Sequence, residues 1–360
     1  MVLCVRCIFS LCIVCLGDVE TIIKIMNHIS NTLLPLCACL YVAIFILGLI
    51  GNGLVILVTA YKMKTTVNTI WFLNLVVADF LFLSLIFTII YKYRDSDWPF
   101  GDFICMLSSL VTVLNMFAST FLLTAISLDR CLSTWVVVWA RTKRTVLKAK
   151  IICLFIWLAA VACSLPLVIF RKTHSNSPQQ TLCIPGFSSL EAYKRVLVFR
   201  FLVGFLIPFV IILASYMTIG VRVKRLRKDN KLKPLRIILA VILAFFFCWL
   251  PFYIYKFLEV WLYEMYDADT SDELTSFQNV FDQMGLFIVS LAYLNSCLNP
   301  FFYVFMCEEF QKKLKQSLVM VFESTFAEEH LALLSQHSQS QCKSHSQSGT
   351  GPSLTQSLTL

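Results

Sequence analysis

The sequence predicts an all-α membrane protein: a bundle of seven transmembrane helices followed by a short amphipathic eighth helix. Three observations support this prediction. Hydrophobic residues make up 58% of the 360 residues and charged residues only 14%, a balance that a soluble globular domain does not need. Apolar runs of about 20 residues, long enough to cross a bilayer, recur along the chain. Basic residues gather in alternate segments between these runs, as the positive-inside rule requires.

Residues 1–33 are expected to form a tail that precedes the bundle. Within it, Leu3 to Leu16 is an apolar run that contains Arg6 and is too short to span a bilayer comfortably. Two interpretations of residues 1–25 stay open. They are an upstream or non-native extension, with Met26 as an alternative start, or a signal peptide that is cleaved.

Seven predicted spans follow within residues 34–304. Each is apolar enough to lie in lipid, where a helix satisfies every backbone polar group internally. The spans cover 34–60, 68–92, 103–134, 149–170, 194–222, 235–261 and 278–304.

The charges between the spans predict the orientation. Most of the 30 basic residues lie after the first, third and fifth spans and in the C-terminal tail. The segment from Glu264 to Glu273, between the sixth and seventh spans, contains three aspartates and no basic residue. The rule for cytoplasmic loops therefore predicts a multi-pass membrane protein with an extracellular N-terminus and a cytoplasmic C-terminus. The net charge of +9 reflects this bias, so nucleic acid is excluded as a partner.

The chain beyond the seventh span divides into two parts. Residues 305–323 combine apolar residues four apart with intervening lysines, a pattern typical of an amphipathic helix on the inner leaflet. Residues 324–360 are rich in Ser, Gln and Thr and are predicted to be disordered. Phosphorylation of this tail would create a strip of negative charge; the alternative is a tail that only aids solubility.

A series of short motifs runs along the spans in a fixed order. In that order, the motifs resemble those of rhodopsin-like (class A) G-protein-coupled receptors over about residues 33–325. LNMFASTFLLTAISLDRC, VWARTKRTV and FRFLVGFLIP are similar to the chemoattractant group, most of all to the chemokine-like (chemerin) receptors, with formyl-peptide, anaphylatoxin and prostaglandin D2 receptors nearby. The motifs are GNGLVI with Asn52, LNLVVADFLF with Asp79, the run Trp98 to Gly101, DRC at 129–131, Trp157, Pro208, Tyr216, FCWLPFY at 247–253 and LNSCLNPFFYVF at 294–305.

Cys105 and Cys183 are the only cysteines in the predicted extracellular loops. Because that compartment is oxidising, a disulfide between them is expected. It would hold the loop between the fourth and fifth spans over the mouth of the bundle.

Asp79 is a lone carboxylate halfway along an apolar span. A buried carboxylate needs partners or a proton, and polar residues recur at comparable depth on other spans. The resemblance implies that this group surrounds an allosteric sodium ion that favours the resting state. The alternative is a protonated Asp79 in a dry hydrogen-bond network. The other candidate residues are Asn115, Ser119, Asn295, Ser296 and Asn299.

Asp129 and Arg130 end the third span on the predicted cytoplasmic side. Charged residues inside a membrane helix are costly, so the default interpretation is functional. Asp129 can hold Arg130 and release it when the helices move, and the resemblance makes Arg130 the residue that meets the G protein. Cys131 stands where the family usually has tyrosine, as in the chemoattractant group.

Proline kinks in the sixth and seventh spans are candidates for the conformational switch, because a proline frees backbone carbonyls and bends a helix. The alternative is an ordinary kink at each position. The resemblance adds aromatic and polar residues to the switch. The candidates are Tyr216, Trp249, Pro251, Asn299, Pro300 and Tyr303.

Arg200 and Lys256 are the candidates for ligand recognition. Arg200 lies two turns before Pro208, and Lys256 lies seven residues beyond Trp249, on about the same helix face. Arginine suits capture of a carboxylate. We expect Arg200, helped by Lys256, to bind the anionic end of a ligand; the alternative is a snorkelling Arg200. The other candidate lining residues are Thr112, Met116, Trp249, Phe252, Tyr253 and Phe287.

The resulting functional hypothesis is a receptor, not an enzyme, for a peptide or small-protein chemoattractant, coupled to a heterotrimeric G protein of the Gi type. Two alternatives stay open: a receptor for a lipid carboxylate such as prostaglandin D2, and a scavenger receptor of the same fold. A transporter would often show internal repeats and broken helices, which the sequence lacks. It also lacks an HExxH motif and paired intramembrane aspartates.

Overall fold

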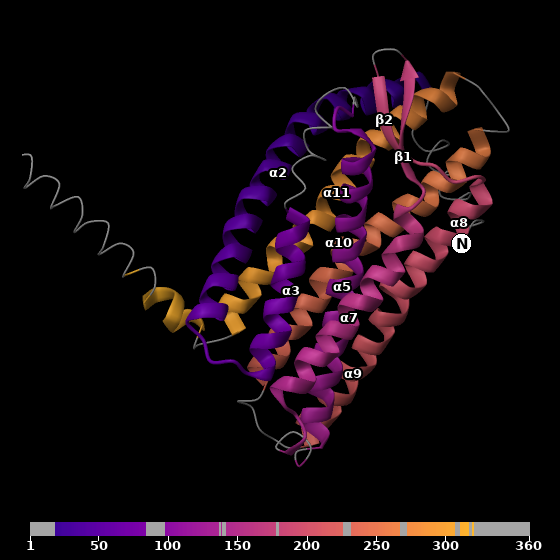
Figure 1. Cartoon of the computed structure of the whole chain (residues 1–360). Helices are drawn as coiled ribbons and strands as arrows, with labels where there is room; N and C mark the ends of the chain where they lie inside the picture. Colours follow the sequence, from indigo (N-terminus) through magenta and orange to yellow (C-terminus); the bar gives the residue numbers. More distant parts are fainter. Residues whose placement is uncertain are drawn as a thin grey trace, which may run out of the picture. The chain divides into compact units, whose positions relative to one another are not determined.

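A computed structural model gives the architecture of the chain (Figure 1). The chain divides into two units, Met1–Cys307 and Glu308–Leu360, which are described separately. The structure describes residues 19–83, 98–136, 138, 142–177, 180–225, 232–266, 272–306, 310–316 and 319.

The first unit is a bundle of long helices with one hairpin. In chain order the elements are α2 (Val19–Tyr61), α3 (Val67–Leu83), α5 (Gly101–Trp135), α7 (Val146–Val168), β1 (Arg171–Ser177), β2 (Gln180–Pro185), α8 (Leu190–Phe201), η1 (Leu202–Leu206), α9 (Ile207–Arg225), α10 (Leu232–Tyr266) and α11 (Asp272–Met306). Because α8, η1 and α9 form one continuous helix, they correspond to the predicted fifth span. The described part of the bundle thus contains a helix at each of the seven predicted positions.

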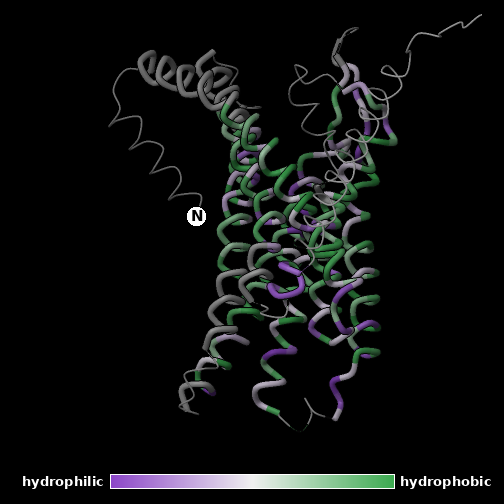
Figure 2. Tube along the Cα trace, turned by 90° about the vertical axis from the view of Figure 1, so that its left-hand side faces the viewer, coloured by the Kyte–Doolittle hydropathy of each residue, from purple (hydrophilic) through white to green (hydrophobic). Residues whose placement is uncertain are grey.

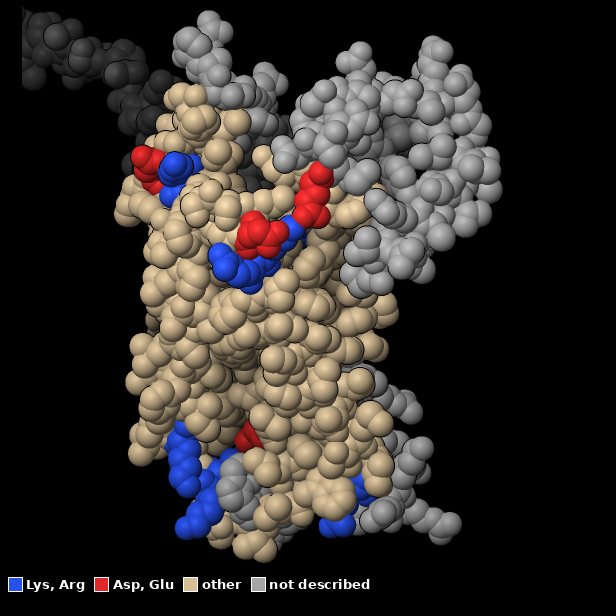
Figure 3. Space-filling model, turned by 90° about the vertical axis from the view of Figure 1, so that its right-hand side faces the viewer, with Lys and Arg blue, Asp and Glu red and all other residues tan. Residues whose placement is uncertain are grey.

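The outer surface of the bundle is apolar, as lipid contact requires. Within the described residues, five helical segments are long and apolar enough to cross a membrane, and Val67–Leu81 and Met284–Pro300 are shorter apolar helices. Hydrophobic residues dominate along the tube in Figure 2. On the face drawn in Figure 3, a broad band without charged side chains separates charged groups at the two ends. In α7, Leu154 and Phe155 are exposed, whereas Ala160 and Ser164 are buried, so small residues make the helix contacts.

A β-hairpin caps one end of the bundle, which we call the hairpin end; the other is the opposite end (Figure 1). Strands β1 and β2 pair antiparallel, with Thr173 across from Cys183. The disulfide between Cys105 and Cys183, with Cα atoms 5.8 Å apart, ties β2 to the start of α5, as predicted. A second tie comes from Asp102, whose carboxylate accepts hydrogen bonds from the Thr173 backbone N–H (2.6 Å) and hydroxyl (2.7 Å).

A π-helical segment, η1, interrupts the helix that carries Arg200. Its Gly204 packs so closely on α5 that a Cβ atom there would overlap Met116 and crowd Phe117. The Gly204 carbonyl accepts a hydrogen bond from Thr120 of α5 at 3.1 Å. The wider turn of a π-helix exposes backbone carbonyls in this way, so the segment fixes how α8 faces α5.

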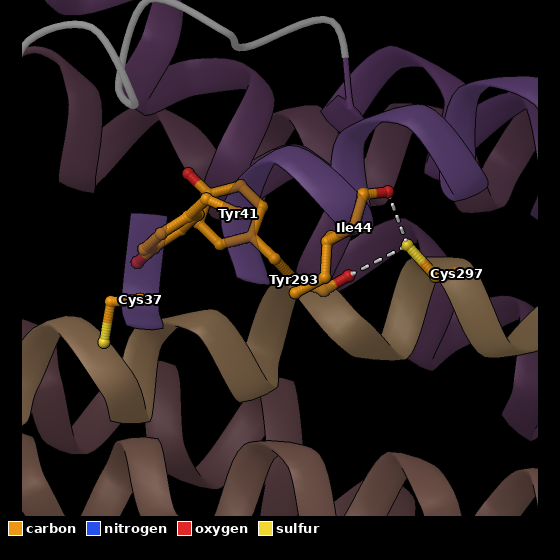
Figure 4. Close-up of a cluster of buried hydrophobic side chains, with 5 residues drawn as sticks. All are labelled: Cys37, Tyr41, Ile44, Tyr293 and Cys297. Atoms are coloured by element: carbon orange, nitrogen blue, oxygen red, sulfur yellow. Dashed lines mark hydrogen bonds between the residues drawn. The ribbon is translucent and has the colours of Figure 1, made fainter. Parts of the chain in front are cut away.

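Helix α11 packs against α2 and α10 through close contacts. A Cβ atom at Gly285 would overlap the ring of Tyr255 on α10. Toward α2, Cys297 donates its S–H to the Ile44 carbonyl at 3.0 Å, and the Tyr41 and Tyr293 rings meet edge to face at 5.7 Å (Figure 4). The close contacts at Gly285 and around Cys297 thus secure both flanks of α11.

Several boundaries differ from the prediction. Helix α2 begins at Val19, so residues expected in the N-terminal tail are helical. The predicted second span runs to residue 92, whereas α3 is described only to Leu83, and residues 84–97 lie outside the described part. In the second unit, residues 310–316 are helical. Of the predicted amphipathic helix 305–323, the structure also describes residues 305–306, at the end of α11, and Val319. The other residues of this helix and the tail 324–360 lie outside the described part of the chain.

Candidate functional site

Arg200 lies at the centre of a cluster near the hairpin end, called here the Arg200 cluster: Arg200, Met116, Phe252 and Tyr253. The Arg200 Nε–H donates to the Met116 sulfur at 3.3 Å, and the guanidinium carbon lies 4.8 Å from the centre of the Phe252 ring. The Tyr253 hydroxyl lies 3.1 Å from the same sulfur and 3.2 Å from the Arg200 carbonyl. The Met116 sulfur therefore contacts both Arg200 and Tyr253, and it joins α5 to α8 and α10.

Helical spacing explains why these residues meet. On α10, Trp249, Phe252, Tyr253 and Lys256 follow one another at intervals of three, one and three, which places them on one face. Met116 projects from α5 with no exposed surface.

The Arg200 guanidinium has no carboxylate partner among the described residues. Its described side-chain contacts are a thioether sulfur and an aromatic ring, which are weak partners for a cation. A half-buried guanidinium is strongly favoured by a carboxylate or phosphate in bidentate geometry. The cluster therefore has the chemistry of an anion-binding site.

Lys256 has a different environment. Its ammonium group contacts both Glu259 carboxylate oxygens, at 2.9 and 2.7 Å, and Glu259 also accepts from the Tyr193 hydroxyl at 3.3 Å. We call Lys256, Glu259 and Tyr193 the rim cluster. Lys256 can therefore help Arg200 to bind an anion only in competition with Glu259, a residue that the sequence analysis did not identify. The i, i+3 spacing of Lys256 and Glu259 on one helix was the signal that could have revealed this pair.

The remaining predicted lining residues are distributed differently. Trp249 is buried and its ring lies 5.6 Å from Phe252, which connects the Arg200 cluster to the bundle interior. Thr112 donates its hydroxyl to the Ser108 carbonyl on its own helix at 2.8 Å. Phe287 is 37% exposed. No described contact joins Thr112 or Phe287 to Arg200.

A polar cluster surrounds Asp79 in the middle of the bundle. Asn299 donates to one Asp79 oxygen at 2.6 Å, and Ser119 lies 3.5 Å from the other. Ser119 also donates to the Asn115 amide oxygen at 3.1 Å, and Asn115 donates to the Ser296 hydroxyl at 3.3 Å. The structure thus brings together five of the six predicted sodium-site residues. Asn295 is buried but makes no described side-chain hydrogen bond.

The oxygen atoms of the polar cluster suit a hard cation. The contact of one Asp79 oxygen with the Ser119 hydroxyl is 3.5 Å long, which is too long for a strong hydrogen bond. The Asn52 amide oxygen is buried without a hydrogen-bond partner among the described residues, although Asn52 donates to the Ser296 carbonyl at 3.0 Å. Carboxylate, amide and hydroxyl oxygens are the ligands that such ions prefer.

At the opposite end, Asp129 is paired with Arg144 rather than with Arg130. The Arg144 Nε–H donates to both carboxylate oxygens at 2.8 and 3.1 Å, and its terminal nitrogen donates to Asp129 at 2.7 Å and to Asn68 at 2.5 Å. Arg144 thereby joins α5 to α3 from just before α7. The predicted hold of Asp129 on Arg130 is replaced by this contact, and sequence reasoning did not single out Arg144.

Arg130 lies in the electrostatic field of Asp129, Arg144 and Tyr216. The Arg130 Nε and the Tyr216 hydroxyl are buried without a hydrogen-bond partner among the described residues. Unsatisfied buried polar atoms are costly, so this end of the bundle can gain hydrogen bonds through rearrangement or a partner.

The switch candidates lie on three helices: Tyr216 on α9, Trp249 and Pro251 on α10, and Asn299, Pro300 and Tyr303 on α11. Pro251 and Pro300 sit inside these helices, and Pro300 is close enough to α2 that a Cβ atom at Gly51 would crowd its ring. The Trp249 indole N–H has no partner among the described residues. Tyr303 belongs to α11, but its side chain lies outside the described part of the chain.

Comparison with known proteins agrees with a bundle of seven transmembrane helices. Residues 51–303 match the family described as 7 transmembrane receptor (rhodopsin family). The chain is similar to the C3a anaphylatoxin chemotactic receptor of Danio rerio, with 39% identity over 292 residues that cover 80% of this chain and 77% of the relative. The human chemerin-like receptor 1 is 39% identical over 76% of this chain and 75% of the relative. Formyl peptide receptor 2 of Mus musculus is 36% identical over 84% of this chain and 88% of the relative.

Proposed function

The chain belongs to the rhodopsin family of seven-transmembrane receptors, and we propose that it responds to a chemoattractant peptide or small protein with an anionic end. As a member of that family it is a multi-pass plasma-membrane receptor and not an enzyme. The relatives that are receptors for C3a, chemerin and formyl peptides support a peptide or protein ligand.

The observation that carries the proposal is the Arg200 guanidinium. It is half-buried, it rests on Met116 and Phe252, and no described carboxylate neutralises it. An anionic ligand end that reached it would exchange water for a charge-assisted hydrogen bond. The hairpin end would then be extracellular, in agreement with the distribution of basic residues, with the N-terminus outside and the C-terminus in the cytoplasm.

A lipid carboxylate is the second candidate ligand, since the same guanidinium would bind a fatty-acid head group of the prostaglandin D2 kind. The apolar and aromatic residues around Arg200 are compatible with either ligand. The peptide is preferred because the relatives named above are peptide or protein receptors.

The opposite end supports coupling to a heterotrimeric G protein, and we propose the Gi type. The Arg130 Nε and the Tyr216 hydroxyl are buried without a geometric hydrogen-bond partner among the described residues, which suits a site that rearranges on activation. Receptor kinases and an arrestin would act on the tail 324–360, which lies outside the described residues. A scavenger receptor is the competing function, and the presence of Asp129 and Arg130 in the sequence motif at the end of the third span weighs against it.

Replacement of Arg144 by glutamine is expected to raise agonist-independent signalling about two- to tenfold, because it removes a bidentate charge pair that holds α5, α3 and the start of α7 together. Basal GTPγS binding to membranes, divided by the number of surface receptors, measures the effect. Lys143→Gln is the matched control because it removes the neighbouring exposed charge. Equal basal binding in both variants and the wild type would contradict the proposed resting-state role.

The polar cluster would hold a sodium ion through Asp79, Ser119 and Asn115, with Asn52, Ser296 and Asn299 around them. The bound ion would supply a positive charge that balances Asp79 and stabilises the resting arrangement. Any ligand that binds only the folded state raises its stability, by about 1–2 kcal/mol when its concentration is ten- to thirtyfold above the dissociation constant.

Thermal unfolding of the purified receptor in sodium chloride and in N-methylglucamine chloride tests this assignment. The wild type is expected to melt about 2–5 °C higher in sodium, and Asp79→Asn is expected to lose the difference. A wild-type receptor that is indifferent to sodium would favour the dry network with a protonated Asp79.

Cyclic AMP inhibition in cells that express the receptor tests the function as a whole. The challenge set contains C-terminal peptides of chemerin and C3a, a formylated peptide and prostaglandin D2, with and without pertussis toxin. A toxin-sensitive response to a peptide supports both the ligand class and Gi coupling. Ligand uptake without signalling would support the scavenger, and a response to prostaglandin D2 alone would support the lipid receptor.

A further inference from the structure

In the rim cluster, the Glu259 carboxylate is already paired with Lys256, one of the two predicted ligand-binding cations. Glu259 lies one helical turn beyond Lys256 on α10, and both of its oxygens are within 3 Å of the ammonium nitrogen. Neither side chain is fully exposed: the Lys256 side chain is 24% accessible and the Glu259 side chain 28%. Partial burial strengthens the pair relative to a surface ion pair.

Tyr193 fixes Glu259 from a second helix. Its hydroxyl donates to Glu259 at 3.3 Å, so α8 and α10 are joined at this point. The Tyr193 ring lies 5.5 Å from Phe187, which in turn lies 5.0 Å from Phe170 at the base of the hairpin. Phe187, supported by Phe170, therefore holds Tyr193 in place, and the Glu259 carboxylate is preorganised rather than free to turn into water.

Helical spacing places the Arg200 cluster and the rim cluster next to each other. Arg200 lies seven residues beyond Tyr193 on α8, and Lys256 lies four residues beyond Phe252 on α10, so each of the two helices carries both clusters on about the same face. Glu259 is the carboxylate that the structure describes beside these two cations, and it contacts Lys256.

We propose that Glu259 is a built-in counter-ion that holds Lys256 in the unliganded receptor and must yield Lys256 when an anionic ligand end binds at Arg200. The inference rests on the proposed function, because it takes Arg200 as the anchor for that anion. In the bound state, the ligand anion would lie between Arg200 and Lys256 while Glu259 keeps its contact with Tyr193.

This arrangement makes Glu259 a determinant of selectivity. When only a fraction of the receptors is in the state that binds a ligand, the apparent affinity for that ligand is reduced by that fraction. Glu259 imposes such a reduction on anionic ligands, because its ion pair with Lys256 must break before they bind and because its charge repels theirs. A ligand with a neutral end does not need Lys256 and is not affected in this way.

The experiment measures the affinity of one peptide in two forms that differ only at the C-terminus, a free carboxylate and an amide. The probe is the C-terminal peptide of chemerin or of C3a that activates the wild type. Glu259→Gln removes the charge but keeps an oxygen for Tyr193. We expect it to tighten binding of the free acid about three- to tenfold and to leave the amide unchanged.

Glu191→Gln is the matched control. Glu191 forms the same i, i+3 pair with Lys194 on α8, but it is exposed and belongs to neither cluster. Its removal is expected to leave the ratio of acid to amide affinity at the wild-type value. The double variant Lys256→Gln with Glu259→Gln carries no unpaired charge at the rim, and it should lose the gain of the single variant.

The possible outcomes separate the inference from the proposed function. If Arg200→Gln weakens the acid while Glu259→Gln behaves like the wild type, the counter-ion inference is wrong and the proposed function stands. If Glu259→Gln weakens acid and amide equally, Glu259 binds a cationic group of the peptide instead. If it reaches the surface poorly, the double variant decides: retention of the gain would contradict the role of Lys256. Silence of the wild type toward both peptides overturns the proposed function and the inference together.

Discussion

Replacement of Arg200 by alanine is expected to weaken binding of a peptide that ends in a carboxylate about ten- to a hundredfold. The physical reason is the loss of a charge-assisted hydrogen bond in a partly desolvated site, worth about 1.5–3 kcal/mol. The structure adds a specific expectation, because the Arg200 side chain contacts a thioether and an aromatic ring, those of Met116 and Phe252, and no carboxylate among the described residues. Removing it leaves no described carboxylate without its counter-ion, so the loss should be confined to ligand binding.

Competition binding on intact cells, with surface receptor numbers determined in parallel, measures this loss. Arg195→Ala is the matched control: it removes an exposed arginine five residues earlier on the same helix. The amidated form of the peptide should lose little affinity in the Arg200 variant. An unchanged affinity for the acid, at normal surface expression, would mean that Arg200 is not the anion site.

Replacement of Cys183 by serine is expected to lower the stability of the hairpin end by about 2–5 kcal/mol. The disulfide closes a loop with a sequence separation of 78 between Cys105 and Cys183, and it anchors β2 to the first turn of α5. Without it, hydrogen bonds such as those from Thr173 to Asp102 would have to hold the hairpin. Fewer receptors should reach the cell surface, and those that do should bind ligand poorly.

Thermal unfolding of the purified protein, followed with and without a reducing agent, measures the stability. The wild type in reducing agent should approach the Cys183 variant. Cys39→Ser is the control, since that cysteine is free and exposed. A variant that melted with the wild type would show that the hairpin is held by its other contacts.

The spans were predictable because length and hydropathy suffice to specify a membrane helix. The hairpin was not predicted. Strand β1 is polar throughout, RKTHSNS, so it lacks the alternation of apolar and polar residues that identifies a strand. Its pairing is imposed from outside, by the disulfide at Cys183 and by Asp102, and tertiary contacts of this kind leave no local pattern in the sequence.

The candidate sites divide along the same line. The members of the polar cluster were identified from single polar residues in apolar spans, where such residues are conspicuous. Arg144 was not identified, because it lies in a stretch with two other basic residues, Arg141 and Lys143. Only the packing of α3 beside α5 determines which of the three pairs with Asp129. The Lys256–Glu259 pair lies between these cases, since helical spacing alone indicates it.

The π-helical segment at Leu202–Leu206 has a consequence for protein engineering and for divergence between related chains. An α-helix turns by about 100° per residue. One extra residue in a wider turn therefore rotates the helix before it, α8, by that angle relative to the helix after it, α9. Deleting a single residue between Leu202 and Leu206 would therefore rotate Arg200 away from Met116 and Phe252 while every side chain of both clusters stayed intact. A sequence alignment of such a shortened receptor with this chain would still show an arginine at the position of Arg200. The side chain of that arginine would nevertheless point away from the other residues of the anion site.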